Sequence, residues 1–251
     1  MNKLIKSICI IAAIPFIGTL MHGQPSEASG AQSILPVRFV YVSSGDLPDG
    51  QPEPDLQALL DSGTGINELL LGPGGQSPVI EFRRGLPLTL FKTVKKGERE
   101  ERKTLASLSF PPAWKGALFL VRYNRALSPY PYQFTPIEFW GGDIADKHVR
   151  FYNLCPVKLA VVLAGTQASI NPHQSADLDV SSATTFMPIK IFATRSEDGR
   201  PVAVKTGLPK LSAPRLLLLA YPMTAEFNNI SILTVGDLPM PPTPSAVPAP
   251  R

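Results

Sequence analysis

Short apolar segments, each bounded by glycine, proline, asparagine or serine, recur along most of the chain. Examples are residues 37–41, 79–82, 88–91, 118–121 and 137–139. Brief apolar runs with such boundaries are typical of β-strands. One run, residues 55–61, has a weak helical pattern and predicts a short helix. Because helices do not alternate with the strands, the pattern favours a sandwich of antiparallel sheets over a parallel sheet.

Four of these segments recur, in the same order, in the second half of the chain. Residues 37–39 (Val-Arg-Phe) match residues 149–151, residues 87–93 match 188–194, residues 118–123 match 216–221, and residues 137–139 match 230–232. The offset falls from 112 residues at the first match to 93 at the last, and the surplus of the first half lies within residues 43–65. Self-similarity of this kind predicts a tandem duplication. Because each matched segment is short, a strand pattern shared by chance remains the alternative.

Each half has the length and number of strand candidates of an immunoglobulin-like sandwich, about 100 residues and about seven strands. We therefore expect an all-β fold: two tandem immunoglobulin-like antiparallel β-sandwiches, the first copy with an acidic loop insertion. The predicted parts are a signal peptide (1–31), copy 1 (32–143), copy 2 (148–237) and a Pro-rich tail (238–251). Such a tail favours polyproline II and would act as a spacer.

Composition agrees with this fold class. The 251 residues include 27 prolines, about twice the usual share of ~5%, which excludes an all-helical bundle. Hydrophobic residues make up 44% and charged residues 18%. A chain of this composition has enough apolar side chains for a packed core, and it does not have the high charge of a disordered protein.

The N-terminus predicts export. Lys3 and Lys6 precede an apolar run at residues 8–21, which is shorter than the ~20 residues that a membrane-spanning helix needs. This arrangement is typical of a secretory signal peptide, and an uncleaved anchor is the alternative. The mature protein would reside in the periplasm, on the outer-membrane surface or outside the cell. Its one cysteine, Cys155, has apolar neighbours and is expected to be a buried thiol rather than an intermolecular link.

Residues suited to catalysis or metal binding are few. The motifs G-x-S-x-G, H-E-x-x-H and C-x-x-C are absent from the sequence, and the mature chain would keep two histidines, His148 and His173. Together with Cys155, these could in principle bind copper or zinc, but their spacing matches no known site. Asp46 and Asp49, close to further carboxylates, do not have the spacing of a calcium loop. We expect no enzymatic activity, no cofactor and no metal site.

Charge is concentrated in two segments of the first copy. The formal net charge is +4, and without the signal peptide it falls to +3, which equals the net charge of residues 92–103 alone. The basic segment includes Lys95, Lys96, Arg99 and Arg102 and predicts a charged hairpin tip. The acidic segment, residues 39–82, lacks Lys and Arg and includes Asp46, Asp49, Glu53, Asp55, Asp61 and Glu68. We hypothesise that the two patches guide contact between subunits or with another surface protein; two solvated loops are the alternative.

Aromatic residues suggest a second candidate surface. Tyr130 and Tyr132 lie on a proline-rich loop, and tyrosines on stiff loops are favoured anchors at interfaces. The same loop could instead cap the edge of the sandwich. Trp114 and Trp140 are expected to pack at the core or its rim. If both were exposed and coplanar with the two tyrosines, they would favour a carbohydrate-binding surface.

The paired Val-Arg-Phe segments, the paired Pro-Leu/Ile-x-Leu/Ile-Phe strands and the signal peptide resemble exported bacterial proteins with immunoglobulin-like sandwiches, including some of type IV pilus-like surface systems. The prepilin pattern of a long hydrophobic helix is missing. The resemblance implies adhesion, assembly or host contact without catalysis. We therefore expect an exported, non-enzymatic protein-interaction module of the cell envelope or surface. A carbohydrate- or peptide-binding accessory protein of a degradative system is the alternative.

Expected partners follow from the same reasoning. They are other envelope or surface proteins, or a second copy of the chain. Nucleic acid is not expected, because the acids of the basic segment would weaken phosphate binding and no nucleic-acid-binding motif accompanies it. No integral membrane span is expected in the mature chain, because no apolar run after the signal peptide is long enough.

Overall fold

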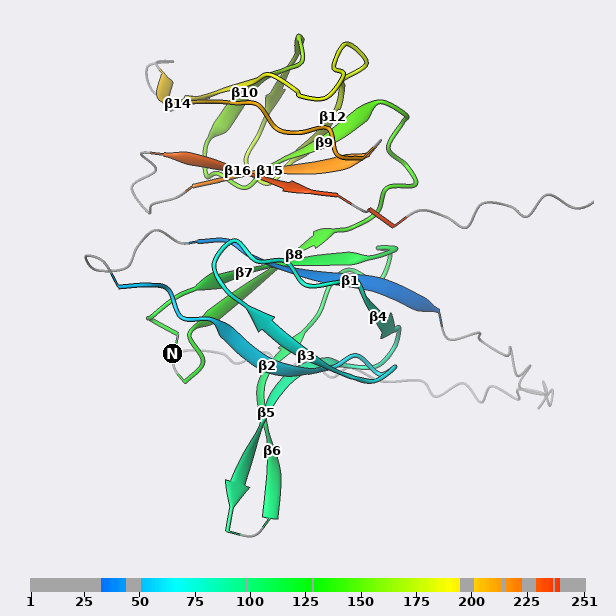
Figure 1. The fold of residues 1–251 in the computed structure, drawn as a ribbon, viewed down its shortest axis with the longest axis vertical. Helices are drawn as coiled ribbons and strands as arrows, with labels where there is room; N and C mark the ends of the chain where they lie inside the picture. The colour runs from blue at the N-terminus through cyan, green and yellow to red at the C-terminus, as the bar shows by residue number, and fades with distance from the viewer. Residues whose placement is uncertain are drawn as a thin grey trace, which may run out of the picture. The chain divides into compact units, whose positions relative to one another are not determined.

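Sixteen β-strands and no helix form the secondary structure of the described residues in the computed structural model (Figure 1). The structure describes residues 33–43, 51–97, 99–127, 129–194, 201–213, 215–222, 229–236 and 238–239. These residues belong to one compact unit, which runs from Gln32 to Arg251. The predicted signal peptide and residues 240–251 of the predicted tail lie outside the described residues. The all-β prediction is confirmed for the part of the chain that the structure describes.

The first eight strands are β1 (Ile34–Tyr41), β2 (Leu56–Asp61), β3 (Ile66–Leu71), β4 (Ile80–Arg83), β5 (Leu88–Lys96), β6 (Arg99–Leu108), β7 (Ala117–Tyr123) and β8 (Tyr132–Glu138). The second eight are β9 (His148–Asn153), β10 (Lys158–Leu163), β11 (Thr166–Ile170), β12 (Ser175–Asp179), β13 (Ile189–Thr194), β14 (Pro201–Gly207), β15 (Leu216–Pro222) and β16 (Ile230–Val235).

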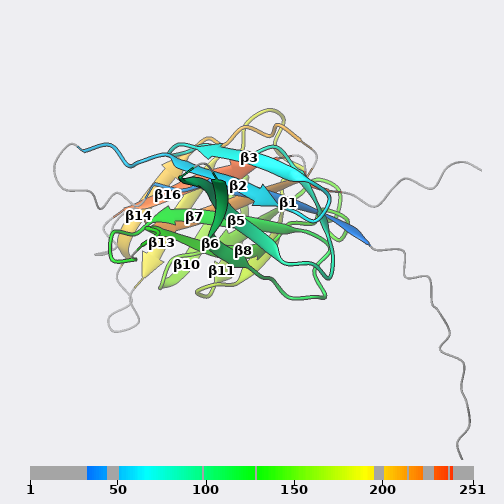
Figure 2. The ribbon, with the colours of Figure 1, turned by 90° about the horizontal axis from the view of Figure 1, so that it is seen from below.

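The strands form four four-stranded sheets in two pairs. In the first half the strand orders are β4-β1-β7-β8 and β3-β2-β5-β6, and Figure 2 shows β3, β2 and β5 side by side. In the second half the orders are β12-β9-β15-β16 and β11-β10-β13-β14. Adding eight to each label of the first half reproduces the second. The described parallel pairs, β1–β7 and β9–β15, also correspond, so the two halves have the same strand topology. These pairs make one sheet of each half mixed, whereas the sequence predicted purely antiparallel sandwiches.

The predicted helix at residues 55–61 is wrong, because this segment forms strand β2. Leu56, Ala58 and Leu60 are buried while Gln57, between them, is exposed. That alternation is the period of a strand, in which successive side chains point to opposite faces. β2 pairs with β3 on one side and β5 on the other, so its backbone groups find partners that a short isolated helix would lack.

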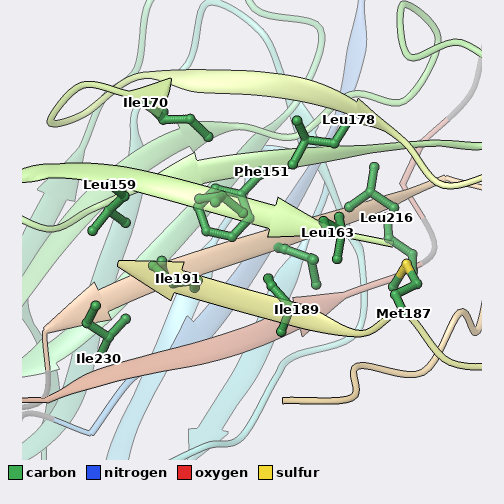
Figure 3. Close-up of a cluster of buried hydrophobic side chains, with 14 of the residues drawn as sticks. Phe151, Leu159, Leu163, Ile170, Leu178, Met187, Ile189, Ile191, Leu216 and Ile230 are labelled. Carbon is green, nitrogen blue, oxygen red and sulfur yellow. The ribbon is translucent and has the colours of Figure 1, made fainter. Parts of the chain in front are cut away.

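Each pair of sheets encloses its own hydrophobic core. In the first half, Phe39 of β1 and Phe119 of β7 stack with ring centroids 5.3 Å apart. In the second half, Phe151 of β9 lies among aliphatic side chains that include Leu159 and Ile191 (Figure 3). The inward-facing side chains alternate along each strand, which is how a sandwich fills the space between its two sheets.

A third hydrophobic cluster joins the two halves. Val40 and Leu120 from the first half and Leu217 and Leu219 from the second belong to it, and all four are buried. The central strands β1, β7 and β15 therefore bury both faces. Strands buried on both faces consist of continuous apolar residues, which explains the run of four leucines at residues 216–219.

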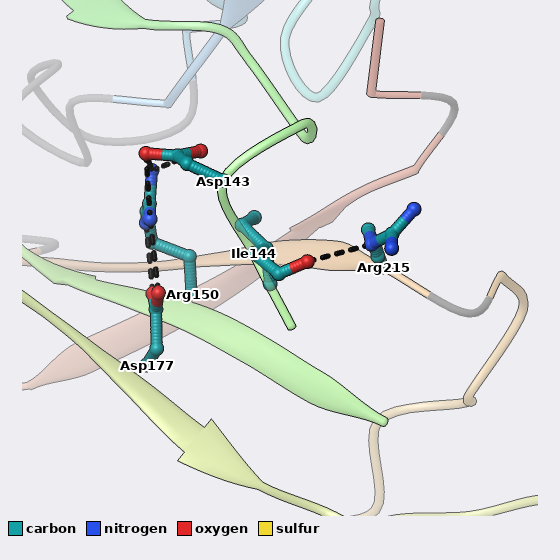
Figure 4. Close-up of polar contacts among 5 residues, drawn as sticks. All are labelled: Asp143, Ile144, Arg150, Asp177 and Arg215. Atoms are coloured by element: carbon teal, nitrogen blue, oxygen red, sulfur yellow. Dashed lines mark hydrogen bonds and ion pairs between the residues drawn. The ribbon is translucent and has the colours of Figure 1, made fainter. Parts of the chain in front are cut away.

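The segment between β8 and β9 is bound to the second half by ionic and polar contacts (Figure 4). Arg150 of β9 donates from Nε to Asp177 Oδ1 at 2.8 Å and forms an ion pair with Asp143 at 3.2 Å. Hydrogen bonds to Asp177 and Asp143 raise the pKa of the Arg150 guanidinium further above its usual value. Arg215 Nε donates to the Ile144 carbonyl at 2.7 Å. The connecting segment is thereby held at Asp143 and Ile144.

Candidate functional site

The outer half of the β5–β6 hairpin extends beyond the sandwich to which its inner half belongs (Figure 1). On β5, Leu88, Leu90 and Phe91 are buried, whereas residues 92–96 are exposed. The corresponding strands of the second half, β13 and β14, have six and seven residues, against nine and ten for β5 and β6. The outer half adds nothing to the core of its own sandwich.

The cross-strand register places like charges opposite one another on one face of this outer half. Lys92 is opposite Lys103, and Lys96 is opposite Arg99. Like charges directly opposite on a sheet are destabilising. The ion pair of Lys96 with Glu101, at 3.8 Å, joins side chains that are 84% and 63% exposed, so it contributes little. We call this face the basic face; it carries Lys92, Lys96, Arg99 and Lys103 together with one acid, Glu101.

On the opposite face of the hairpin, charges are balanced. Lys95 is opposite Glu100. Arg102 lies 4.7 Å from the centroid of the Phe91 ring and forms an ion pair with Asp61 of β2 at 3.7 Å. This face is therefore internally satisfied, while the basic face is not.

The structure distributes the predicted basic residues between the two faces: Lys96 and Arg99 lie on the basic face, and Lys95 and Arg102 lie on the opposite face. Sequence reasoning missed Lys92 and Lys103 as site residues. The signal that could have found them is the turn: Gly97 has a φ of +69°, a conformation that favours glycine, and counting outward from the tip pairs Lys92 with Lys103.

Glu53, Asp55 and Asp61 of the acidic segment contact their own chain. Glu53 Oε1 accepts a hydrogen bond from Ser43 Oγ at 2.8 Å, and the main-chain carbonyl of Asp55 accepts one from the Tyr132 hydroxyl at 2.9 Å. Asp61 pairs with Arg102 of the same chain. Asp46 and Asp49 lie outside the described residues, so the predicted acidic insertion stays a prediction.

Tyr130 and Tyr132 belong to an aromatic cluster at the edge of the first core. Tyr132 lies edge-to-face against Tyr41 and Tyr123, at 6.2 and 5.7 Å, and its centroid is 5.0 Å from that of Tyr130. Burial raises the pKa of Tyr132 to about 12 and also raises that of Tyr130. The two tyrosines are half-buried and tilted at 52° to each other, so they form part of the packing rather than a flat binding platform.

Cys155 and His148 make contacts within the fold of the second half. Cys155 is fully buried and its Sγ lies 3.7 Å from the Ala220 carbonyl, and burial raises its pKa to about 12. His148 begins β9, and its Nδ1 lies 2.9 Å from the Asp146 carbonyl. Among the described residues, no three His, Cys, Asp or Glu side chains form a group that could hold a metal ion.

The two tryptophans are half-buried. Trp114 stacks on Phe110, with centroids 6.3 Å apart and an interplanar angle of 17°, and packs against the first core. Trp140 lies under the ammonium of Lys115, at 5.2 Å from the ring centroid. The tryptophans are thus neither both exposed, as a carbohydrate-binding surface would need, nor both fully buried in the core.

Comparison with known proteins adds no family to these observations. No protein-family model and no curated protein matches the sequence. Within the described residues, no helix has the length and hydrophobicity needed to cross a membrane.

Proposed function

We propose that the chain is an exported, non-enzymatic protein-interaction module of the cell envelope or surface, built from two duplicated immunoglobulin-like sandwiches. The basic face of the β5–β6 hairpin is its partner-binding element, and the partner presents paired carboxylates. Association with a pilus-like surface system, adhesion or assembly would suit such a module. The N-terminal sequence supports export, and the equal strand orders of the two halves support duplication.

The pairing of like charges is the observation that carries this proposal. Lys92–Lys103 and Lys96–Arg99 each cost the free protein some stability, and neither pair supports the core. Locally unfavourable arrangements without a structural benefit are expected at functional sites. A carboxylate placed between the two cations of a pair would convert repulsion into two attractions, which gives a partner both orientation and specificity.

Protection of a sheet edge does not account for the basic face. β6 is an edge strand, and charged side chains do discourage edge strands from pairing with other chains. However, opposite charges such as Lys95 and Glu100 would protect the edge equally well without repulsion. In the described part of the second half, the corresponding edge strand β14 has seven residues, against ten for β6.

Site-specific photocrosslinking in the native cells tests the proposal. A crosslinking amino acid at Val94, which is 42% exposed on the basic face, should produce an adduct of defined mass with a protein. The same amino acid at Thr93, on the opposite face, should produce much less. The double substitution Lys96→Gln/Arg99→Gln should lower the yield of the Val94 adduct several-fold, since each exposed charge contact contributes about 0.2–1 kcal/mol.

The matched control is Lys158→Gln/Lys190→Gln, which removes the same charge from exposed positions in the second half. This variant should leave the adduct unchanged. Equal losses in both double variants, or equal yields from positions 93 and 94, would contradict binding through the basic face.

A further inference from the structure

A polar cleft of about 370 Å³ lies where the two halves meet. Its walls come from β8 and the connection before β7 in the first half, and from β9 and the start of β12 in the second. Pockets that hold small ligands begin at about 300 Å³ and combine an apolar surface with a few convergent polar groups. The hairpin contributes nothing to this cleft, so it is independent of the proposed protein-binding element.

Trp114 supplies the aromatic surface of the cleft. One side of its indole is occupied by the ring of Phe110, and its carbonyl accepts a hydrogen bond from Arg84 Nη2 at 2.8 Å. The ring is thereby held in place while it lines the cleft. The C–H groups on one face of a sugar ring form an apolar surface of suitable size to pack on such an indole.

The polar wall combines side chains that have no partner among the described residues. Glu138, Tyr152, His173 and Ser175 all line the cleft. Burial raises the pKa of Tyr152, so its hydroxyl remains protonated and able to donate. Together these groups can donate to and accept from the vicinal hydroxyls of a sugar.

The backbone holds His173 in an unfavourable conformation at the cleft. Its φ is +59°, the left-handed region, which costs a residue other than glycine roughly 1–2 kcal/mol. The conformation is enforced by the neighbouring strand: His173 N donates to the Asn153 carbonyl at 2.8 Å, and Asn153 N donates to the Gln174 carbonyl at 2.9 Å. Strain of this kind clusters at binding sites, where the surrounding structure over-determines it.

Charge selects for a neutral ligand. Arg150 also lines the cleft, but its guanidinium already donates to both oxygens of Asp177 and to Asp143, so it is not available to bind an anion. With Glu138 in addition, the immediate surroundings of the cleft carry more negative than positive charge. Phosphate, sulfate and uronic acids are therefore disfavoured.

We propose that this cleft binds a neutral saccharide, with the sugar ring packed on Trp114 and its hydroxyls bonded to Glu138, Tyr152, His173 and Ser175. This function goes beyond protein interaction and does not depend on it.

Fluorescence of Trp114 provides a direct test. The full chain contains two tryptophans, so Trp140→Phe leaves Trp114 as the single reporter. Cellobiose, maltose and chitobiose are titrated to 50 mM, with galacturonate as an anionic probe and choline chloride as a cationic probe. We expect a saturable change with at least one neutral disaccharide and none with the two charged probes. In the same background, Glu138→Gln should weaken binding about tenfold, and Ser175→Ala should weaken it measurably.

The control substitution is Glu68→Gln, which makes the same charge change on exposed β3 and should leave the response intact. Lys96→Gln/Arg99→Gln should also leave it intact, because the hairpin lies outside the cleft. Absence of a saturable response to all three disaccharides overturns the proposal. So does an equal effect of Glu138→Gln and Glu68→Gln, or a response to choline or galacturonate in place of the disaccharides.

Discussion

Replacing Leu219 with alanine tests whether the third hydrophobic cluster forms in solution. Leu219 and its neighbour Leu218 are both fully buried, but Leu218 points into the core of the second half and Leu219 into the cluster between the halves. If the two halves stood apart, Leu219 would lie on a solvent-facing sheet surface. Its truncation would then change the free energy of unfolding by only about 0.5 kcal/mol.

The cluster predicts a much larger effect. Leu219 is opposite Leu233 on β16 and Tyr152 on β9, and both neighbours pack against the same cluster. Truncation of a buried leucine removes its transfer free energy and leaves a cavity, at a combined cost of about 2–5 kcal/mol. Leu218→Ala and Leu219→Ala should therefore destabilise the protein by similar amounts.

Urea unfolding followed by circular dichroism measures both free energies. Val162→Ala is the control, because Val162 faces outward from β10 and is half-exposed, and its truncation should cost less than either leucine. The packing of the two halves would be refuted if Leu219→Ala lowered the free energy of unfolding by about 0.5 kcal/mol or less while Leu218→Ala lowered it by about 2–5 kcal/mol.

Two further predictions concern single buried positions. Gly116→Ala should destabilise the protein by about 1–3 kcal/mol, because an added Cβ would collide with the Phe139 carbonyl oxygen and with Pro36; thermal unfolding checks this, and an unchanged melting temperature would contradict it. Burial raises the pKa of Cys155 from 9.0 to about 12, so the folded state holds its proton more tightly than the unfolded state. The contribution of this thiol to the free energy of unfolding is then fully present below pH 9 and is lost as the pH rises toward 12. In urea unfolding between pH 8.5 and 11, Cys155→Val should show a shallower loss than the unsubstituted protein, and equal slopes would refute the assignment.

Local patterns were sufficient to predict the fold class and much of the strand content. The apolar runs at residues 37–41, 88–91 and 118–121 lie within β1, β5 and β7, because short runs with turn residues at both ends indicate strands whatever packs against them. The burial of Cys155 followed equally from its apolar neighbours. The helix predicted for residues 55–61 is wrong, because so short a segment fits a helix as well as a strand until its pairing partners are known.

The sequence by itself determined that this chain builds short-stranded sheets, that two similar halves follow each other, and that a charged hairpin lies in the first. Tertiary structure decided which faces meet. It showed that Leu217 and Leu219 of the second half pack against the first half. It also showed that the basic residues of the hairpin divide between two faces, and that Trp114 and His173 line one cleft. The physical reason is one of range: the period of two along a strand is a local property, whereas register, sheet pairing and cleft formation depend on contacts between residues far apart in the chain.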